Sequence, residues 1–210
     1  MKTLATFILA IAAPLIMLAQ EPQPEKSRFI RTKLPGGVTL DVPKGWNYAG
    51  PDQKRIMETY AESLWDLTGV PFGRVGTLLM AKPPQNLGYM CVTVALEYRQ
   101  TATQQQLQQI PKTQLAELDQ QNRKDLEAES PYNGLKIQSW GGTTIEKVGN
   151  SYAMIKRYSY TLPNGPVRRL ENCQFFLGDK IVSIMFEDTD GTIIPAKPIF
   201  ERIKTSIDFR

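Results

Sequence analysis

Apolar and polar residues alternate over much of the second half of the chain, between residues 136 and 186. Three dipeptides that favour tight turns interrupt this alternation: Gly149-Asn150, Asn164-Gly165 and Gly178-Asp179. Alternation with a period of two is typical of strands with one buried face, and such dipeptides often connect antiparallel neighbours. The pattern therefore predicts four strands in an antiparallel meander.

The register of these strands follows from the turns if each turn contains two residues. Across Gly178-Asp179, Phe175 then lies opposite Val182, and across Asn164-Gly165 it lies opposite Met154. The same register places five residues on one face of the sheet near Asn164-Gly165, where they form a candidate binding surface: Lys156, Tyr158, Tyr160, Arg169 and Glu171. Aromatic residues mixed with Arg are common in binding sites. Tyrosines that complete a core while their hydroxyls reach water would give the same pattern.

The rest of the chain contains three further strand patterns, at residues 38–42, 76–81 and 89–98. Apolar positions at steps of three and four predict helices over 52–67 and 195–207. Good helix formers fill 101–129, where Pro111 marks either a break or the N-terminal turn of a helix. Both faces of the predicted sheet carry apolar residues, so both need a covering layer. We expect an α+β fold, a three-layer α/β/α sandwich with a central antiparallel sheet.

The first 19 residues have the composition of a secretory signal peptide. Lys2 precedes an apolar run from Phe7 to Ala19, which is too short for a spanning helix and which we expect to be cleaved after Ala19. Residues 20–36 are rich in proline and charge and predict a linker, so the domain should occupy residues 37–210. The expected location is the periplasm or the exterior of the cell.

Composition excludes several classes of function. The chain has no histidine, so Ser-His-Asp and Cys-His catalysis are impossible, and a zinc site would have only two thiols. Without Lys2, 24 Lys and Arg remain against 21 Asp and Glu, a surplus too small to indicate nucleic-acid binding. We expect no cofactor and no metal.

The two cysteines, Cys91 and Cys173, would enter an oxidising compartment, where an even number permits one disulfide. Two buried free thiols in two strands are the alternative, because an unpaired cysteine behaves as a small apolar core residue. The sequence leaves both readings open.

The order of motifs resembles the PsbP-like family. The chain opens the domain with a strand that runs from Gly37 through Pro43 to Gly45-Trp46, and it closes with a helix around Ile199–Ile203 followed by Ser206 and Phe209. This family includes the photosystem II extrinsic protein PsbP and bacterial envelope proteins of the DcrB type. The resemblance implies an antiparallel sheet between helix layers and a role in accessory binding rather than catalysis.

Acidic residues near the end of the last predicted strand offer the remaining candidate chemistry. Asp188-Thr189-Asp190-Gly191 starts like a calcium loop, but Lys197 stands where the closing Glu would be, which favours an ordinary turn. A pair of carboxylates such as Glu187 and Asp188 could hydrolyse a substrate without histidine. The sequence therefore predicts an exported, non-catalytic accessory protein with an envelope or extracellular protein partner. The alternatives are a carboxylate-dependent hydrolase and a carrier of a small apolar ligand.

Overall fold

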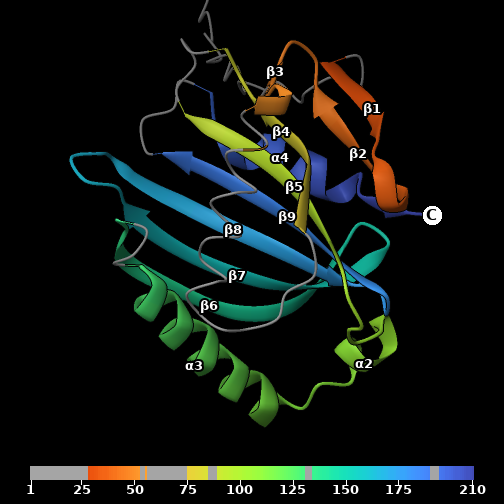
Figure 1. The fold of residues 1–210 in the computed structure, drawn as a ribbon, viewed down its shortest axis with the longest axis vertical. Helices are drawn as coiled ribbons and strands as arrows, with labels where there is room; N and C mark the ends of the chain where they lie inside the picture. The colour runs from red at the N-terminus through yellow and green to blue at the C-terminus, as the bar shows by residue number, and fades with distance from the viewer. Residues whose placement is uncertain (1–27, 53–54, 56–74, 85–88, 131–133, 190–193) are drawn as a thin grey trace, which may run out of the picture.

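The computed structural model describes residues 28–52, 55, 75–84, 89–130, 134–189 and 194–210. These residues form an α+β fold with two antiparallel sheets (Figure 1). The larger sheet has seven strands, in the spatial order β3 (Asn47–Tyr48), β4 (Val75–Lys82), β5 (Met90–Tyr98), β9 (Lys180–Thr189), β8 (Val167–Phe176), β7 (Ser151–Thr161) and β6 (Lys136–Val148). The predicted meander is its β6–β9 half.

The smaller sheet brings the two ends of the described chain together. Strand β2 (Val38–Pro43) pairs with β1 (Phe29–Lys33) on one side and with β10 (Asp208–Phe209) on the other. The prediction of a linker over residues 20–36 was therefore wrong for β1. A turn at Pro35–Gly37 returns the chain so that β1 pairs with β2, and Phe29 packs against the core. Residues 1–27, including the predicted signal peptide, lie outside the described residues.

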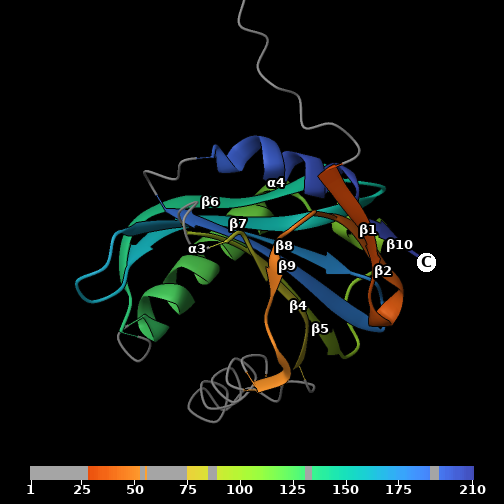
Figure 2. The same ribbon diagram turned by 90° about the horizontal axis from the view of Figure 1, so that it is seen from above.

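In the described part of the chain, helices α2, α3 and α4 accompany the sheets. The predicted break at Pro111 separates α2 (Gln104–Gln108) from α3 (Lys112–Glu129), and α4 (Ala196–Thr205) forms the closing helix. Helix α4 lies on one face of the seven-stranded sheet and α3 on the other (Figure 2). The helix expected over 52–67 falls almost wholly outside the described residues, so the complete three-layer sandwich stays a prediction. None of the helices in the described ranges is long and apolar enough to cross a membrane.

The main core lies on the α4 face of the large sheet. Alternate residues of β4, β5, β7, β8 and β9 meet α4 and β2 there, and the largest fully buried side chains include Phe175, Phe186, Leu40, Ile184 and Ile203. Phe175 lies against Phe209, with ring centroids 4.8 Å apart, and Phe186 lies against Phe200 at 5.2 Å. The aromatic pairs therefore attach both α4 and β10 to this face.

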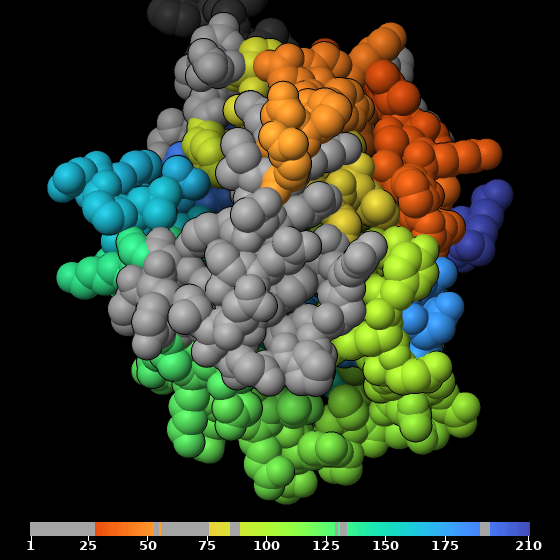
Figure 3. Space-filling view, viewed as in Figure 1, coloured from red at the N-terminus to blue at the C-terminus, as the bar shows by residue number. Residues whose placement is uncertain are grey.

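The register of the meander differs from the prediction in one pair of strands. Phe175 lies opposite Val182, as expected, but Met154 pairs with Gln174 rather than with Phe175. Thr161 is the last residue of β7 to pair and Val167 the first of β8, so the loop contains five residues instead of two. Two prolines, Pro163 and Pro166, stand within it. This β7–β8 loop projects from one side of the molecule (Figures 1 and 3).

Candidate functional site

The one-residue difference in register divides the predicted binding surface between the two faces of the sheet, because successive side chains of a strand point to opposite sides. Arg169 and Glu171 lie on the α4 face, where their cross-strand partners are Ser159 and Arg157. Lys156, Tyr158 and Tyr160 are paired instead with Asn172, Leu170 and Arg168. The five residues therefore do not form one surface, although Tyr158 lines the same pocket as Arg169 and Glu171.

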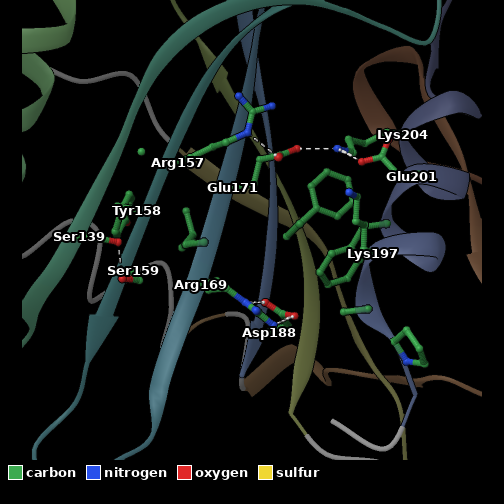
Figure 4. Close-up of a pocket in the computed structure, with 16 residues that line it drawn as sticks. Ser139, Arg157, Tyr158, Ser159, Arg169, Glu171, Asp188, Lys197, Glu201 and Lys204 are labelled. Carbon is green, nitrogen blue, oxygen red and sulfur yellow. Dashed lines mark hydrogen bonds and ion pairs between the residues drawn. The ribbon is translucent and has the colours of Figure 1, made fainter. Parts of the chain in front are cut away.

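A pocket of about 560 Å³ lies on the α4 face, between α4 and strands β6–β9 (Figure 4). This volume is in the range of ordinary ligand sites. Its apolar part is formed by Phe186, Pro195, Ala196 and Phe200. Ser139 and Ser159 face it from the meander, and their hydroxyl oxygens are 2.7 Å apart. We call this pocket the α4 groove.

One end of the α4 groove is closed by a chain of ion pairs. Lys204 Nζ lies 2.8 Å from Glu171 Oε1 and 2.6 Å from Glu201 Oε1, and Arg157 Nε lies 2.9 Å from Glu171 Oε2. Arg157 also contacts Glu146 at 2.8 Å, outside the groove. Burial raises the pKa of Glu171, but Lys204 and Arg157 outweigh that effect and hold the pKa below its ordinary value. Glu171 is therefore ionised at neutral pH.

The other end carries a two-point ion pair between β8 and β9. Arg169 Nε and Nη2 donate hydrogen bonds to the two carboxylate oxygens of Asp188, at 3.0 and 2.7 Å. Such a paired geometry is the strongest form of an Arg–carboxylate contact. Asp188, which begins the calcium-like sequence, thus has a cation as its partner, while residues 190–193 of that sequence lie outside the described residues. No group of three metal-binding side chains occurs in the described ranges.

The wall that α4 contributes is a stripe at helical spacing. Lys197, Phe200, Glu201 and Lys204 stand at positions i, i+3, i+4 and i+7 and all line the groove. Residues at this spacing share one face of a helix. The apolar residues of α4 were predicted to pack on the sheet, whereas the role of its charged residues was not predicted. The i, i+3, i+4, i+7 spacing of these four residues was the available signal.

A second polar cluster lies on the opposite face of the sheet, around Glu187. Tyr89 Oη donates a hydrogen bond to Glu187 Oε2 at 2.8 Å, Tyr160 Oη donates to Oε1, and Arg168 Nη1 lies 3.1 Å from Oε1. The Arg168 guanidinium also lies 4.2 Å from the centre of the Tyr89 ring. Burial, followed by the nearby Glu187 carboxylate, raises the pKa of both tyrosines well above the ordinary value.

The two carboxylates that the sequence offered as a catalytic pair, Glu187 and Asp188, lie on opposite faces of the sheet. Glu187 and Asp188 are neighbours on β9, so Glu187 points to the tyrosine cluster and Asp188 to the α4 groove. Paired carboxylates of a glycoside hydrolase must flank the same bond. The geometry of these two residues gives the hydrolase alternative no support.

Both cysteines are free and buried in the structure, so the disulfide alternative is not formed. Cys91 lies on β5 and Cys173 on β8, with β9 between them. Cys91 pairs with Glu187 and Cys173 with Ile184, three residues along β9, which places the thiols on opposite faces of the sheet. Burial raises the pKa of both thiols, so neither is a ready nucleophile.

Comparison with known proteins places the fold but not the activity. No protein-family model matches the chain, and no curated protein matches it. Among solved structures, it is similar to cyanobacterial PsbP (CyanoP) from Synechocystis sp. PCC 6803, with 10% identity and a TM-score of 0.55 over 92% of this chain and 99% of that one. A protein from Bacteroides thetaiotaomicron VPI-5482 matches 87% of this chain and 49% of its own length, with 10% identity and a TM-score of 0.44. The chain has a PsbP-like fold.

Proposed function

We propose that this protein is an exported, non-catalytic accessory protein of the bacterial cell envelope that binds a protein partner through the α4 groove. The apolar residues of the groove offer contact area, and the ion pairs at its two ends make a polar rim, which is the usual anatomy of a protein-binding surface. The PsbP-like fold supports an accessory role by analogy.

One observation carries the non-catalytic part of the proposal: each carboxylate that lines the groove has a cation as its partner. Asp188 is held by Arg169, while Glu171 and Glu201 share Lys204. A general acid needs a carboxyl whose pKa is raised enough to stay protonated, and Glu171 has the opposite shift. These charges are therefore suited to shaping a surface rather than to transferring protons.

The partner proposal can be tested by blocking the groove without disturbing the core. Ser139 is exposed and lines the groove, whereas its exposed neighbour Gln138 does not. We expect Ser139→Trp to abolish capture of the partner from a native envelope extract, and Gln138→Trp to retain it. Equal capture by the two variants, compared by quantitative mass spectrometry, would contradict a role for the groove.

Export is a separate part of the proposal and rests on the sequence of residues 1–19. If the signal peptide is cleaved after Ala19, protein recovered from the periplasm or the medium should begin at Gln20. Intact-mass measurement of that material checks the site directly. A full-length mass in the cytoplasmic fraction would remove the export proposal and leave the groove proposal intact.

The carrier of a small apolar ligand remains a second candidate, because the groove lies between sheet and helix and has an apolar lining. Native mass spectrometry of protein purified without denaturation separates the two ideas. A reproducible adduct of a few hundred daltons that Ser139→Trp removes would favour the carrier. A mass equal to that of the chain alone would favour the protein partner.

A further inference from the structure

Most charged side chains of the α4 groove form ion pairs within the described structure, but Lys197 does not. This unpaired cation indicates the chemistry of the partner. Arg157, Arg169 and Lys204 each contact at least one carboxylate. Lys197, exposed in the first turn of α4, makes no ion pair with any residue that the structure describes. All three carboxylates in the lining have a cation, so the uncompensated charge of the lining is positive.

Apolar surface lies directly beside this cation. Phe200 follows Lys197 by three residues, is only half-buried and lines the groove, and its ring packs on the buried Phe186. Side chains at i and i+3 of a helix have Cβ atoms roughly 5–6 Å apart. A ligand can therefore contact both residues with an anion and an apolar group at about that separation, since the flexible Lys197 side chain adapts to the position of the anion.

An extended peptide offers this spacing with one residue between the two groups. Its residues i and i+2 lie on the same side, about 6.6 Å apart, since each residue advances the strand by roughly 3.3 Å. Strand β6 lies at the edge of the described sheet, but the strands on which the segment would lie, β7, β8 and β9, are paired with neighbours on both sides. The segment is therefore held by its side chains, with no backbone ladder added to the sheet.

Resting on the proposed function, we infer that the α4 groove takes an extended segment of the partner in which a Glu or Asp stands two residues from a bulky apolar residue. The carboxylate lies at Lys197 and the apolar side chain lies against Phe200. The Arg169–Asp188 and Lys204–Glu171 pairs border the segment at either end. Because Lys197 is exposed, its contact with the carboxylate adds little affinity. Its main effect is to favour a partner segment with a negative charge over one with a positive charge.

The test uses four short synthetic peptides and the purified protein. The parent peptide is acetyl-Gly-Glu-Ser-Phe-Gly-amide, and its variants replace Glu by Gln, Glu by Lys, or Phe by Ser. Binding is followed by the shifts of backbone amide NMR signals. We expect the parent to perturb Lys197, Phe200 and Ser159, the Lys peptide to bind about fivefold more weakly, and the Ser peptide about tenfold more weakly.

A charge reversal in the protein gives the decisive comparison. Lys197→Glu should invert the preference, so that the Lys peptide binds better than the Glu peptide. Lys112→Glu, an equally exposed charge reversal at the start of α3, should leave the preference unchanged. A Glu preference that survives in Lys197→Glu, shifts that lie outside the groove, or no binding by any of the four peptides would overturn the inference.

These outcomes are separable from failure of the proposed function. If Ser139→Trp loses the envelope partner while the peptides show no charge preference, the groove binds a partner of other chemistry and only the inference is wrong. If Ser139→Trp captures the partner as well as Gln138→Trp does, the proposed use of the groove is wrong, whatever the peptides do.

Discussion

The two faces of the seven-stranded sheet bury their side chains in different ways. The α4 face is a continuous apolar core, in which Phe175, Val182 and Ile184 are fully buried, and its charges lie at the edge around the groove. The opposite face buries polar groups among its apolar ones, with Glu187 held by two tyrosines and an arginine. Apolar side chains stabilise the fold in proportion to the surface area that they remove from water. Buried polar groups must instead each form a hydrogen bond or an ion pair.

The two faces therefore differ in the kind of substitution to which the fold is most sensitive. Removing an apolar side chain from the α4 face loses both its transfer free energy and the packing around it. On the opposite face, a change of charge matters more than a change of volume, because an unpartnered buried charge is costly.

Phe175 and Phe176 are neighbours in sequence that point to opposite faces, so they form a matched pair. Phe175 is fully buried against Phe209, while Phe176 is partly exposed. We expect Phe175→Ala to lower the free energy of unfolding by about 3–5 kcal/mol and Phe176→Ala by roughly half as much, as measured by denaturant titration. An equal or larger loss for Phe176→Ala would break the comparison.

The docking of the α4 end onto the sheet depends on Gly149. A Cβ at this position would stand 2.1 Å from the backbone oxygen of Ile207, and the residue has φ +59°. We expect Gly149→Ala to cost about 2–3 kcal/mol of unfolding free energy, part steric and part from the strained backbone. Gly45→Ala is the control, since φ is +82° there but no atom lies within 4 Å, and it should cost about 1 kcal/mol. Equal losses would show that the close approach to Ile207 is unimportant.

The polar face should be sensitive to alkaline pH. Burial raises the pKa of Tyr89 and Tyr160 above the value of about 10 that an unfolded tyrosine has. A raised pKa in the folded state means that the stabilisation is complete below about pH 10 and is lost as the pH rises above it. Unfolding free energy should therefore fall above that pH, and less steeply in Tyr89→Phe. An identical pH dependence in the variant would show that the cluster does not contribute.

The two thiols lie on opposite faces of the sheet, so their reactivity tests the burial of both faces. We expect the smallest effect here. Cys91 and Cys173 are buried and free, so a thiol reagent should label neither in the native protein and both after unfolding without reductant. The two modifications are counted by intact mass. Unfolded protein that takes up no label until a reductant is added would establish the disulfide after all.

Much of the fold could be predicted because local signals agreed with one another. The break at Pro111, the strand after Gly37, the meander and the closing helix all appear where the pattern placed them. The β8–β9 register was correct as well, since Phe175 lies opposite Val182. The β7–β8 register was wrong because the loop has five residues, and the alternation of apolar residues on both strands permits either pairing.

The candidate site shows where local reasoning ends. Alternation identified Arg169 and Glu171 as residues of interest, but their partners Asp188 and Lys204 come from β9 and α4. Which segments become strands and helices could be predicted from the sequence, because it depends on the spacing of apolar residues within each segment. Which side chains share the groove depends on the pairing of the strands, because a shift of one residue between two strands exchanges the faces of the sheet.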